Sequence, residues 1–315
     1  MKDMKDVKHV LLISFDGLHE QDVARCVGSN SCPNLAVARQ VGRHIHERAH
    51  APRRRSQTKA GTSTPTSRLA RRSLRYHVPG QLARQSRSKT ERNLYASTLI
   101  IVTAKHGQSP TDHTKLVKNG DTLTALLEAN NYLDPNGNFG QNNTKTGNLN
   151  DGSGLSGTGM VQTDDVGLIW LRDQSQKDAV VKTLKANLSC NAPGICADGP
   201  QAYILTGDRL ADWFGNPSNG RTPDIIVQPN AGVIYTSSTK KDEEHGGNAP
   251  DDSHLGLVVS FPGLKHAGRT DDHYVFTTQV APTILSALDL DPRLLHAVQV
   301  EGTHRLPGLG LDDDK

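Results

Sequence analysis

Three residues of this chain, Asp16, His106 and His245, are of the types that bind metals and stand where strands begin or end. Asp16 and His106 each follow an apolar run and precede a glycine, in "LLISFDG" and "LIIVTAKHGQ". His245 lies in the glycine-rich turn "EEHGG", shortly before another apolar run. A carboxylate and imidazoles are ligands that Zn²⁺ and similar divalent ions prefer. Because a lone histidine after a strand is more often a hydrogen-bonded core or surface residue, the three are informative only as a set.

The elements that must position these residues are predicted from the apolar patterns. The runs at 10–15 and 99–103 lack alternation, which is typical of central strands covered on both faces. Further strands are expected at 167–171, 224–229 and 254–261, and helices within 120–133, at 173–188 and at 277–292. This alternation predicts an α/β fold, a three-layer sandwich with a mostly parallel central sheet. Functional groups of such sheets gather at the carboxyl ends of the strands, where Asp16 and His106 stand.

Several polar stretches have simpler interpretations. The segment 136–163 is rich in Gly, Asn, Thr and Ser and is expected to be a long surface loop. The pair at 164–165 is interpreted as a turn and cap before a strand, and the acidic run at 242–244 as a solvated face. Asp112 and His113 follow "HGQSP" and either reach a metal or form a solvated loop.

The arginine-rich segment 39–92 differs from the rest of the chain. It holds 15 Lys and Arg against two acids, a charge of +13, whereas the remainder carries −10. It has no helical or strand period and separates 1–38 from 93–311, which the acidic tail 312–315 follows. Three interpretations stay open: a frame-disrupted stretch, a disordered insert, or an arm that binds nucleic acid or another polyanion through arginine–phosphate contacts.

The four cysteines form two C-x5-C pairs, Cys26 with Cys32 and Cys190 with Cys196. Each pair brackets a short polar loop, which favours local disulfides, with free thiols and a metal site as alternatives. Disulfides would imply an exported protein. The N-terminal residues do not match a signal peptide, because their apolar run is short and leads directly into Asp16. No apolar run is long enough to predict a membrane span.

Four motifs in order, "LLISFDG", "LIIVTAKHGQ", "EEHGG" and "QVAPTILSALDLDP", resemble landmarks of the alkaline phosphatase superfamily. The branch they most resemble is that of type I phosphodiesterases and nucleotide pyrophosphatases, and the resemblance covers about 8–38 and 93–311. It implies an alkaline phosphatase-like fold. It also implies metal-dependent hydrolysis of a small-molecule phosphate ester or diester, in which a Thr or Ser nucleophile lies between two metal ions, usually zinc.

By the same resemblance, Asp16 and His106 would ligate one ion and His245 the other. Lys105 stands where many relatives carry Asp. Its ammonium would either weaken metal binding by repulsion or supply positive charge to a substrate phosphate.

The expected place of the nucleophile falls within the arginine-rich segment. Thr62 and Thr64 are nominal candidates there, with Ser63 and Thr66 beside them, but none lies in a matching motif. The segment 39–98 contains no Asp, so the Asp-x-x-x-His metal-binding pair of the family is missing. We therefore expect catalysis by this chain to be impaired. The alternative is a non-catalytic protein that binds polyanions or nucleic acid through 39–92.

Overall fold

The computed structural model describes two compact units of this chain. The described residues are 6–33, 35, 73–75, 94–134, 138–139, 145–146, 159–191, 193–219, 221–262, 264 and 274–311. Unit 1 comprises the described residues within 6–35, 73–107 and 253–311, and unit 2 comprises the described residues within 108–252. Apart from 73–75, the arginine-rich segment lies outside the described residues, so its three interpretations stay predictions.

Unit 1 is built on a three-stranded sheet in the order β1-β3-β13. The strand β1 (His9–Phe15) runs parallel to β3 (Thr98–Ala104), and β13 (Val258–Ser260) runs antiparallel to β3. The remaining elements of the unit are β2 (Ser73–Arg75), which pairs with β12 (His254–Gly256), the 3₁₀ helices η5 (Thr277–Gln279) and η6 (Pro292–Leu294), and α9 (His296–Glu301).

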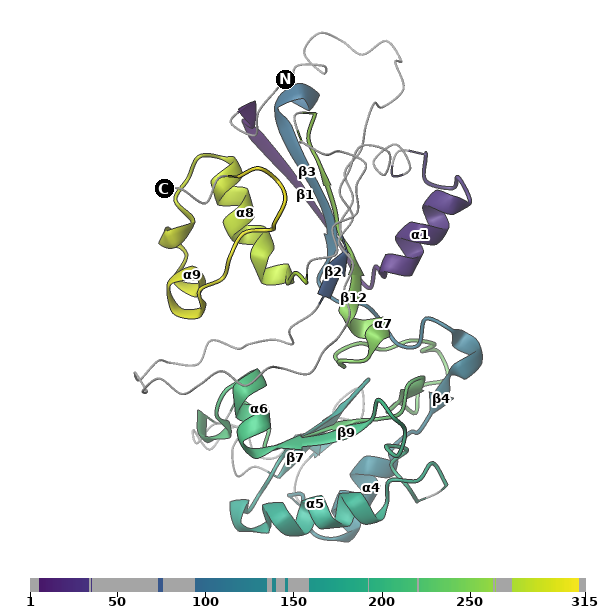
Figure 1. Ribbon diagram of the computed structural model, residues 1–315. Coiled ribbons are helices and arrows are strands. Elements are labelled where there is room, and N and C mark those ends of the chain that lie inside the picture. Colours follow the sequence, from purple (N-terminus) through teal and green to yellow (C-terminus); the bar gives the residue numbers. More distant parts are fainter. Residues whose placement is uncertain are drawn as a thin grey trace. The chain divides into compact units, whose positions relative to one another are not determined.

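Two helices cover opposite faces of this sheet (Figure 1). Helix α1 (Glu20–Gly28) packs Val23 against Val102 and Val258. Helix α8 (Val280–Ala287) packs on the alternate strand positions, Leu99 and Ile101 among them. Successive side chains of a strand point to opposite faces, so the two helices lie on opposite sides. Unit 1 therefore has the three-layer arrangement expected from the sequence.

The strand β1 differs from the sequence prediction in its burial. Leu11, Leu12 and Phe15 are 47%, 45% and 48% exposed, whereas Leu99 and Ile101 of β3 are fully buried. Among the described residues, β1 pairs only with β3, which makes it the edge of the sheet. The prediction of a central strand covered on both faces is thus wrong for β1. An apolar run predicts a strand, but the burial of that strand depends on neighbouring elements that the run itself does not predict.

Unit 2 contains a six-stranded sheet in the order β5-β6-β7-β8-β10-β9, with all pairs antiparallel. Its strands are β5 (Asn138–Phe139), β6 (Lys145–Thr146), β7 (Met160–Thr163), β8 (Gly167–Trp170), β9 (Tyr203–Thr206) and β10 (Ile225–Gln228). The mixed α/β class is confirmed, but the sheets of the protein are only partly parallel. Alternating strands and helices in the sequence do not by themselves impose parallel pairing.

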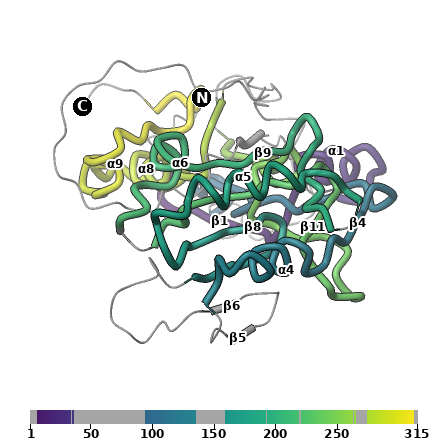
Figure 2. The backbone as a smooth tube through the Cα atoms, turned by 90° about the horizontal axis from the view of Figure 1, so that it is seen from below, coloured from purple at the N-terminus to yellow at the C-terminus, as the bar shows by residue number. Residues whose placement is uncertain are grey.

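Three helices pack on the sheet of unit 2. Leucines and valines of α4 (Thr122–Ala129) and α5 (Lys177–Ala186) join Ile169 and Ile225 in one core, and α6 (Gly207–Phe214) packs Leu210 against Ile226 on the other face. Figures 1 and 2 show α4 and α5 on the same side. The shorter elements are η2 (His113–Lys115), β4 (Val117–Lys118), η3 (Gln174–Gln176), η4 (Pro217–Asn219), β11 (Val233–Ile234) and α7 (Pro250–Ser253).

Two predicted boundaries are corrected by the structure. The expected strand 254–261 is interrupted at Leu257, which separates β12 from β13. The expected loop 136–163 ends in β7, where Met160 and Val161 are buried, and most of its other residues lie outside the described part of the chain. The polar composition of this segment predicted a loop throughout, although the segment ends in a short strand.

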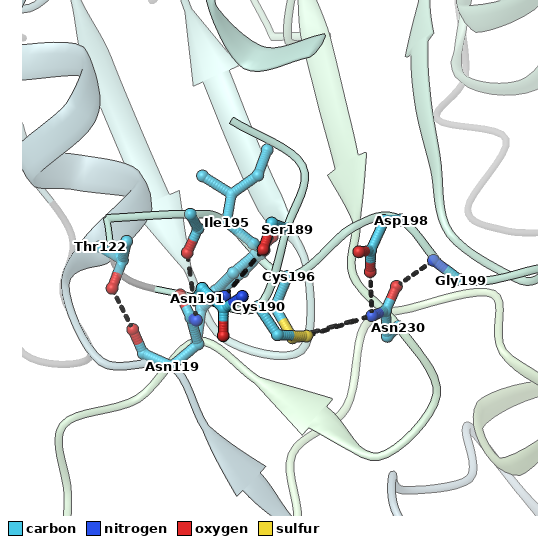
Figure 3. The surroundings of a disulfide bond; sticks show 12 residues. Asn119, Thr122, Ser189, Cys190, Asn191, Ile195, Cys196, Asp198, Gly199 and Asn230 are labelled. Carbon is cyan, nitrogen blue, oxygen red and sulfur yellow. Dashed lines mark hydrogen bonds between the residues drawn. A yellow bond between two sulfur atoms is a disulfide. The ribbon is translucent and has the colours of Figure 1, made fainter. Parts of the chain in front are cut away.

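Both predicted disulfides are present, Cys26–Cys32 in unit 1 and Cys190–Cys196 in unit 2. Figure 3 shows Asn230 beside the second one. Its Nδ2 lies 3.3 Å from Cys190 Sγ and donates to Asp198 at 2.7 Å, while its Oδ1 accepts from the Gly199 N–H at 2.6 Å. Two local disulfides fit an extracellular protein. Within the described residues, no helix has the length and apolar character needed to cross a membrane.

Candidate functional site

The pairing of β1 with β3 places Asp16 beside Lys105 and His106. Phe15 lies opposite Ala104 in the parallel register, and the Lys105 N–H donates to the Phe15 carbonyl at 3.4 Å. The residues that follow these two strands therefore meet at one edge of the sheet, as the sequence predicted. Directly after Asp16, Gly17 has a φ of +70°, a left-handed conformation that glycine adopts without steric cost.

The His106 ring is oriented by a hydrogen bond at each nitrogen. Its Nδ1 lies 2.8 Å from the Gly107 carbonyl oxygen, and its Nε2 lies 2.9 Å from Asp16 Oδ1. Because a carbonyl oxygen and a carboxylate oxygen both only accept, the ring donates from Nδ1 to Gly107 and from Nε2 to Asp16 in this arrangement. A metal-bound histidine is held in the same way, with its second ring nitrogen donating to a carbonyl or carboxylate. The donor types therefore fit a divalent ion held by Asp16 and His106, and such an ion would replace the hydrogen bond between Nε2 and Asp16.

Lys105 is the third residue of the group formed with Asp16 and His106. Its positive charge distinguishes this group from a site made of metal ligands alone. Its Nζ lies 3.3 Å from Asp16 Oδ2, so the carboxylate faces an imidazole with one oxygen and an ammonium with the other. The side chains of Lys105 and Asp16 are 61% and 69% exposed, whereas His106 is buried. Within the described residues, no three His, Cys, Asp or Glu side chains are grouped closely enough to hold a metal ion.

His245, the third predicted ligand, belongs to unit 2. The preceding residue, Glu244, pairs with Ser109: the Ser109 N–H donates to the Glu244 carbonyl at 2.7 Å and the Glu244 N–H donates back at 2.8 Å. Of the predicted ligand set, the structure thus brings together Asp16 and His106, and it places His245 in a loop fixed by Ser109.

Glu244 itself corrects a prediction. The run 242–244 was expected to be a solvated face, but Glu244 is 5% exposed and its carboxylate forms an ion pair with Lys241. Burial, together with hydrogen bonding to Asp164, raises the pKa of Glu244 to about 7, against the opposing effect of Lys241. Asp242, in contrast, is exposed and pairs with Lys118 at 3.7 Å.

A buried pair of carboxyl groups, Asp165 and Asp252, lies in unit 2 and was missed from the sequence. The turn predicted at 164–165 before a strand is present between β7 and β8, but the burial of Asp165 and Asp252, which are 1% and 0% exposed, was not predicted. Burial, followed by the charge of Asp252, raises the pKa of Asp165 well above its usual range. Ser109 Oγ donates to Asp252 Oδ2 at 2.9 Å. The available signal was the presence of two Asp-Asp dipeptides, which are common on surfaces and do not indicate burial.

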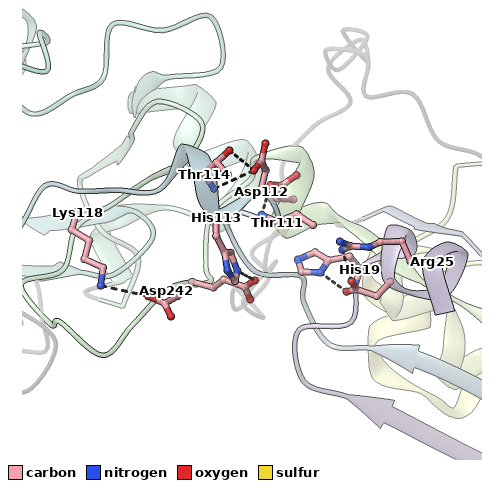
Figure 4. Close-up of polar contacts among 11 residues, drawn as sticks. His19, Arg25, Thr111, Asp112, His113, Thr114, Lys118 and Asp242 are labelled. Carbon is pink, nitrogen blue, oxygen red and sulfur yellow. Dashed lines mark hydrogen bonds and ion pairs between the residues drawn. The ribbon is translucent and has the colours of Figure 1, made fainter. Parts of the chain in front are cut away.

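Asp112 and His113 form part of a polar surface in unit 2 (Figure 4). Asp112 caps η2 by accepting from the Thr114 N–H at 3.1 Å, and His113 Nε2 lies 2.6 Å from Glu243 Oε1. The hydrogen bond to Glu243 raises the pKa of His113. Of the two interpretations of this segment, the structure favours the solvated loop.

The nominal nucleophiles Thr62 and Thr64, with Ser63 and Thr66, lie outside the described residues.

Comparisons with known proteins identify the family of the chain. Its sequence matches the family of type I phosphodiesterase / nucleotide pyrophosphatase over residues 85–251, more than half of its length. No curated protein sequence matches significantly.

Among solved structures, murine ectonucleotide pyrophosphatase / phosphodiesterase 5 (ENPP5) is similar at 13% identity and a TM-score of 0.38, over 64% of this chain and 44% of that one. Human ENPP5 is similar at 14% identity and a TM-score of 0.38, over 64% of this chain and 43% of that one. An inactive murine variant in complex with AMP is similar to the same degree. This chain thus spans less than half the length of these structures. By the match of its sequence, the chain belongs to the type I phosphodiesterase / nucleotide pyrophosphatase family.

Proposed function

We propose that this chain is a metal-dependent hydrolase of phosphate esters or diesters, acting on a small molecule such as a nucleotide. The observation that carries the proposal is the pairing of Asp16 with His106 at the carboxyl ends of two parallel strands, in a member of this family. A carboxylate and a correctly oriented imidazole are a ligand pair suited to Zn²⁺.

The proposed roles follow the chemistry of the side chains. Asp16 and His106 would hold one divalent ion, and His245 would be a ligand of a second. A bound ion would supply positive charge to the phosphoryl oxygens and activate the nucleophile. The Lys105 ammonium, held 3.3 Å from Asp16, would add a point charge toward a substrate phosphate.

The proposed nucleophile is a residue of the arginine-rich segment, with Thr62 and Thr64 as its candidates. Because neither lies in a motif like that of the family, and because 39–98 contains no Asp for the second metal, we propose that activity is impaired. We further propose that the protein is exported, since its two disulfides would persist in an oxidising compartment.

Turnover of bis-p-nitrophenyl phosphate in the presence of Zn²⁺ tests this function. The His106→Ala variant should lose the rate, because it removes a metal ligand. His113→Ala is the matched control, since His113 is exposed, pairs with Glu243 and belongs to unit 2. A rate that persists after chelation, or that His106→Ala leaves unchanged, would contradict a metal-dependent hydrolase.

A second candidate function rests on the charge of +13 carried by 39–92. A polyanion-binding arm should retain the protein on DNA at low salt and release it as the salt concentration rises. Replacing the arginines of the segment with glutamine should abolish retention. Retention that is unaffected by this replacement would exclude the arm as the binding element.

A further inference from the structure

We propose that this chain forms a two-fold dimer in which the strand β1 (His9–Phe15) pairs antiparallel with β1 of a second copy. The pairing would join the three-stranded sheets of two copies into one continuous sheet. The proposal goes beyond the hydrolase function and does not depend on it, because it is argued from the sheet of unit 1 alone.

The outer strand β1 is exposed, whereas the other outer strand of the same sheet is buried. Four large apolar side chains of β1 are 37–48% exposed, those of Leu11, Leu12, Ile13 and Phe15. All residues of β13, at the opposite edge, are buried. The edge of a sheet carries backbone N–H and C=O groups that can pair with a further strand. Of the two outer strands, β1 is therefore the one available for strand addition.

The sequence of β1 has none of the residues that usually protect an exposed edge. Natural sheets block edge pairing with lysines, prolines, bulges or a covering element. The stretch Val10–Phe15 contains no charged residue and no proline. Its register with β3 is continuous from His9 opposite Thr98 to Phe15 opposite Ala104, so no bulge turns the strand away. A long, regular and apolar edge of this kind favours pairing with another strand over contact with solvent.

The direction of the backbone groups limits the register of such a pair. The Lys8 N–H donates to the Ser97 carbonyl at 2.8 Å, which places this group on the side of β3. Because backbone groups alternate between the two edges of a strand, the N–H groups of the even-numbered residues of β1 face β3. Those of His9, Leu11 and Ile13 face away from it. In an antiparallel pair, these three outward-facing residues must lie opposite one another to exchange hydrogen bonds.

A register in which Leu12 lies opposite Leu12 of the second copy meets this condition. Leu11 then lies opposite Ile13 of the second copy, and both have backbone groups that face outward. The side chains match as well, because the exposed apolar positions of one copy meet apolar positions of the other. Apolar pairs directly across two strands stabilise a sheet, so this register covers the side chains that the single copy leaves exposed.

The charges at the ends of β1 favour the same antiparallel arrangement. Lys8 precedes the strand and Asp16 follows it, both are exposed, and each is four positions from Leu12. Lys8 of each copy would therefore lie opposite Asp16 of the other. A parallel pair would instead place like charges together at both ends. Since Asp16 also faces Lys105 of its own copy, the charges contribute more to the choice of orientation than to affinity.

The arrangement closes at two copies. Helices α1 and α8 pack on the two faces of the sheet and leave its edge open, so strand addition does not displace them. In a two-fold contact the same surface of both copies is used up. The outer strands of the joined sheet would then be the buried β13 strands. This predicts a dimer of defined size and not an open series of aggregates.

A cysteine at position 12 tests the register. All four native cysteines are in disulfides, so Leu12→Cys adds one free thiol. Opposite residues of a non-hydrogen-bonded pair have Cα atoms about 4.5 Å apart, a separation that a disulfide can bridge. Leu12→Cys should form a covalent dimer on mild oxidation, as seen by non-reducing electrophoresis. Leu294→Cys is the matched control, since Leu294 is 77% exposed but lies in η6, outside the proposed contact.

Sedimentation equilibrium of the full chain tests the dimer itself. The parent should be mostly dimeric at about 10 μM, as expected for a Kd of about 1 μM or less. Leu12→Lys should raise the Kd at least tenfold, because it places two ammonium groups opposite one another at the two-fold axis. Leu12 is 45% exposed, so a lysine can extend into solvent in the single copy, and circular dichroism checks that the variant is folded. Leu294→Lys should keep the Kd of the parent.

Three results would overturn the proposal. The first is a parent that is monomeric at about 10 μM, including a monomer whose Leu11 and Ile13 amides are protected from hydrogen exchange because another segment of the same chain covers the edge. The second is a dimer that folded Leu12→Lys leaves intact. The third is a Leu12→Cys variant that cross-links no faster than Leu294→Cys, a comparison that stays decisive if Leu12→Lys does not fold. None of these measurements requires turnover, so failure of the hydrolase function would leave them unchanged.

Discussion

In unit 1 the polar groups of interest stand at the exposed ends of two parallel strands. In unit 2 the loop 244–252, which carries His245, is hydrogen-bonded to the buried Ser109. Asp16 is 69% exposed and makes its two ion pairs at the surface. Asp252 is fully buried and is bonded to Ser109, itself buried. Both regions carry carboxylates, but the carboxylate of Asp16 is exposed to solvent and that of Asp252 is buried.

The difference determines how each region responds to substitution. Exposed ion pairs contribute about 0–1 kcal/mol, because solvent screens them and ordering long side chains costs entropy. Buried polar groups that lose a partner cost about 1–3 kcal/mol, and more when they are charged. We therefore expect changes near Asp16 to alter ligand binding while unit 1 stays folded. Changes near Asp252 should alter the stability of unit 2.

The largest effect is expected for Gly247→Ala. The new methyl group would overlap the Asp165 carboxyl group, which is 1% exposed, and would also approach Asp252. We expect the free energy of unfolding of unit 2 to fall by about 3 kcal/mol or more. Urea unfolding followed by tryptophan fluorescence measures this change.

Gly246→Ala is the matched control for that variant. Gly246 has a φ of +116°, and a Cβ there would meet no atom within 4 Å. Its cost should be about 1 kcal/mol, from backbone conformation alone. Equal losses for the two variants would show that contact with Asp165 does not limit the loop.

The two disulfides allow units 1 and 2 to be compared again, with a smaller expected loss of stability than for Gly247→Ala. Each closes a loop with a sequence separation of 6, so chain entropy predicts about 2 kcal/mol for either. Cys196 is fully buried and Asn230 contacts its disulfide, whereas Cys26 and Cys32 are both partly exposed. Replacing Cys190 and Cys196 with alanine should therefore destabilise unit 2 by more than the same change at Cys26 and Cys32 destabilises unit 1. Hydrogen exchange of the backbone amides in each unit measures both losses, and equal losses would argue against a role for the Asn230 contacts.

The sequence predicted the local elements of the fold better than their partners. The runs at 10–15 and 99–103 are strands, and the positions of α4, α5 and α8 agree with the predicted helices. The edge position of β1 and the antiparallel sheet of unit 2 were not predicted. The pairing of strands and the burial of their faces depend on contacts between segments far apart in the chain. Periodicity indicates which face of a helix or strand is apolar, but it does not indicate which element packs against that face.

The candidate site shows the same limit. Asp16 and His106 were predicted to converge because parallel strands end at one edge, a rule that needs only the order of the elements. Asp165 and Asp252 could not be found in this way. They are 87 positions apart in the sequence, and a carboxyl group buried against another is uncommon enough that a solvated turn is the better expectation from residue type alone.

At the exposed edge of unit 1, Lys105→Gln should strengthen metal binding. The ammonium lies 3.3 Å from Asp16 Oδ2 and repels a divalent ion by about 2 kcal/mol at such distances in water. Removing the charge should lower the Kd for Zn²⁺ by up to about thirtyfold, as measured by calorimetry, without changing the stability of the unit. Lys115→Gln is the control, since Lys115 forms a similar exposed pair with Asp112 at 3.5 Å. A weaker or unchanged affinity in Lys105→Gln would mean that Lys105 does not compete with the metal.

The smallest effect is expected at His113 and Glu243, an exposed pair within unit 2. The hydrogen bond to Glu243 raises the pKa of His113, so the pairing stabilises the fold while the ring is protonated and is lost as pH rises through the raised pKa. In Glu243→Gln the pKa of His113, followed by NMR, should return toward the usual value of about 6.5. Added salt should reduce the shift in the parent, because both groups are accessible to ions. A raised pKa of His113 that persists in Glu243→Gln and at high salt would mean that other groups of unit 2, and not the exposed pair with Glu243, stabilise the protonated ring.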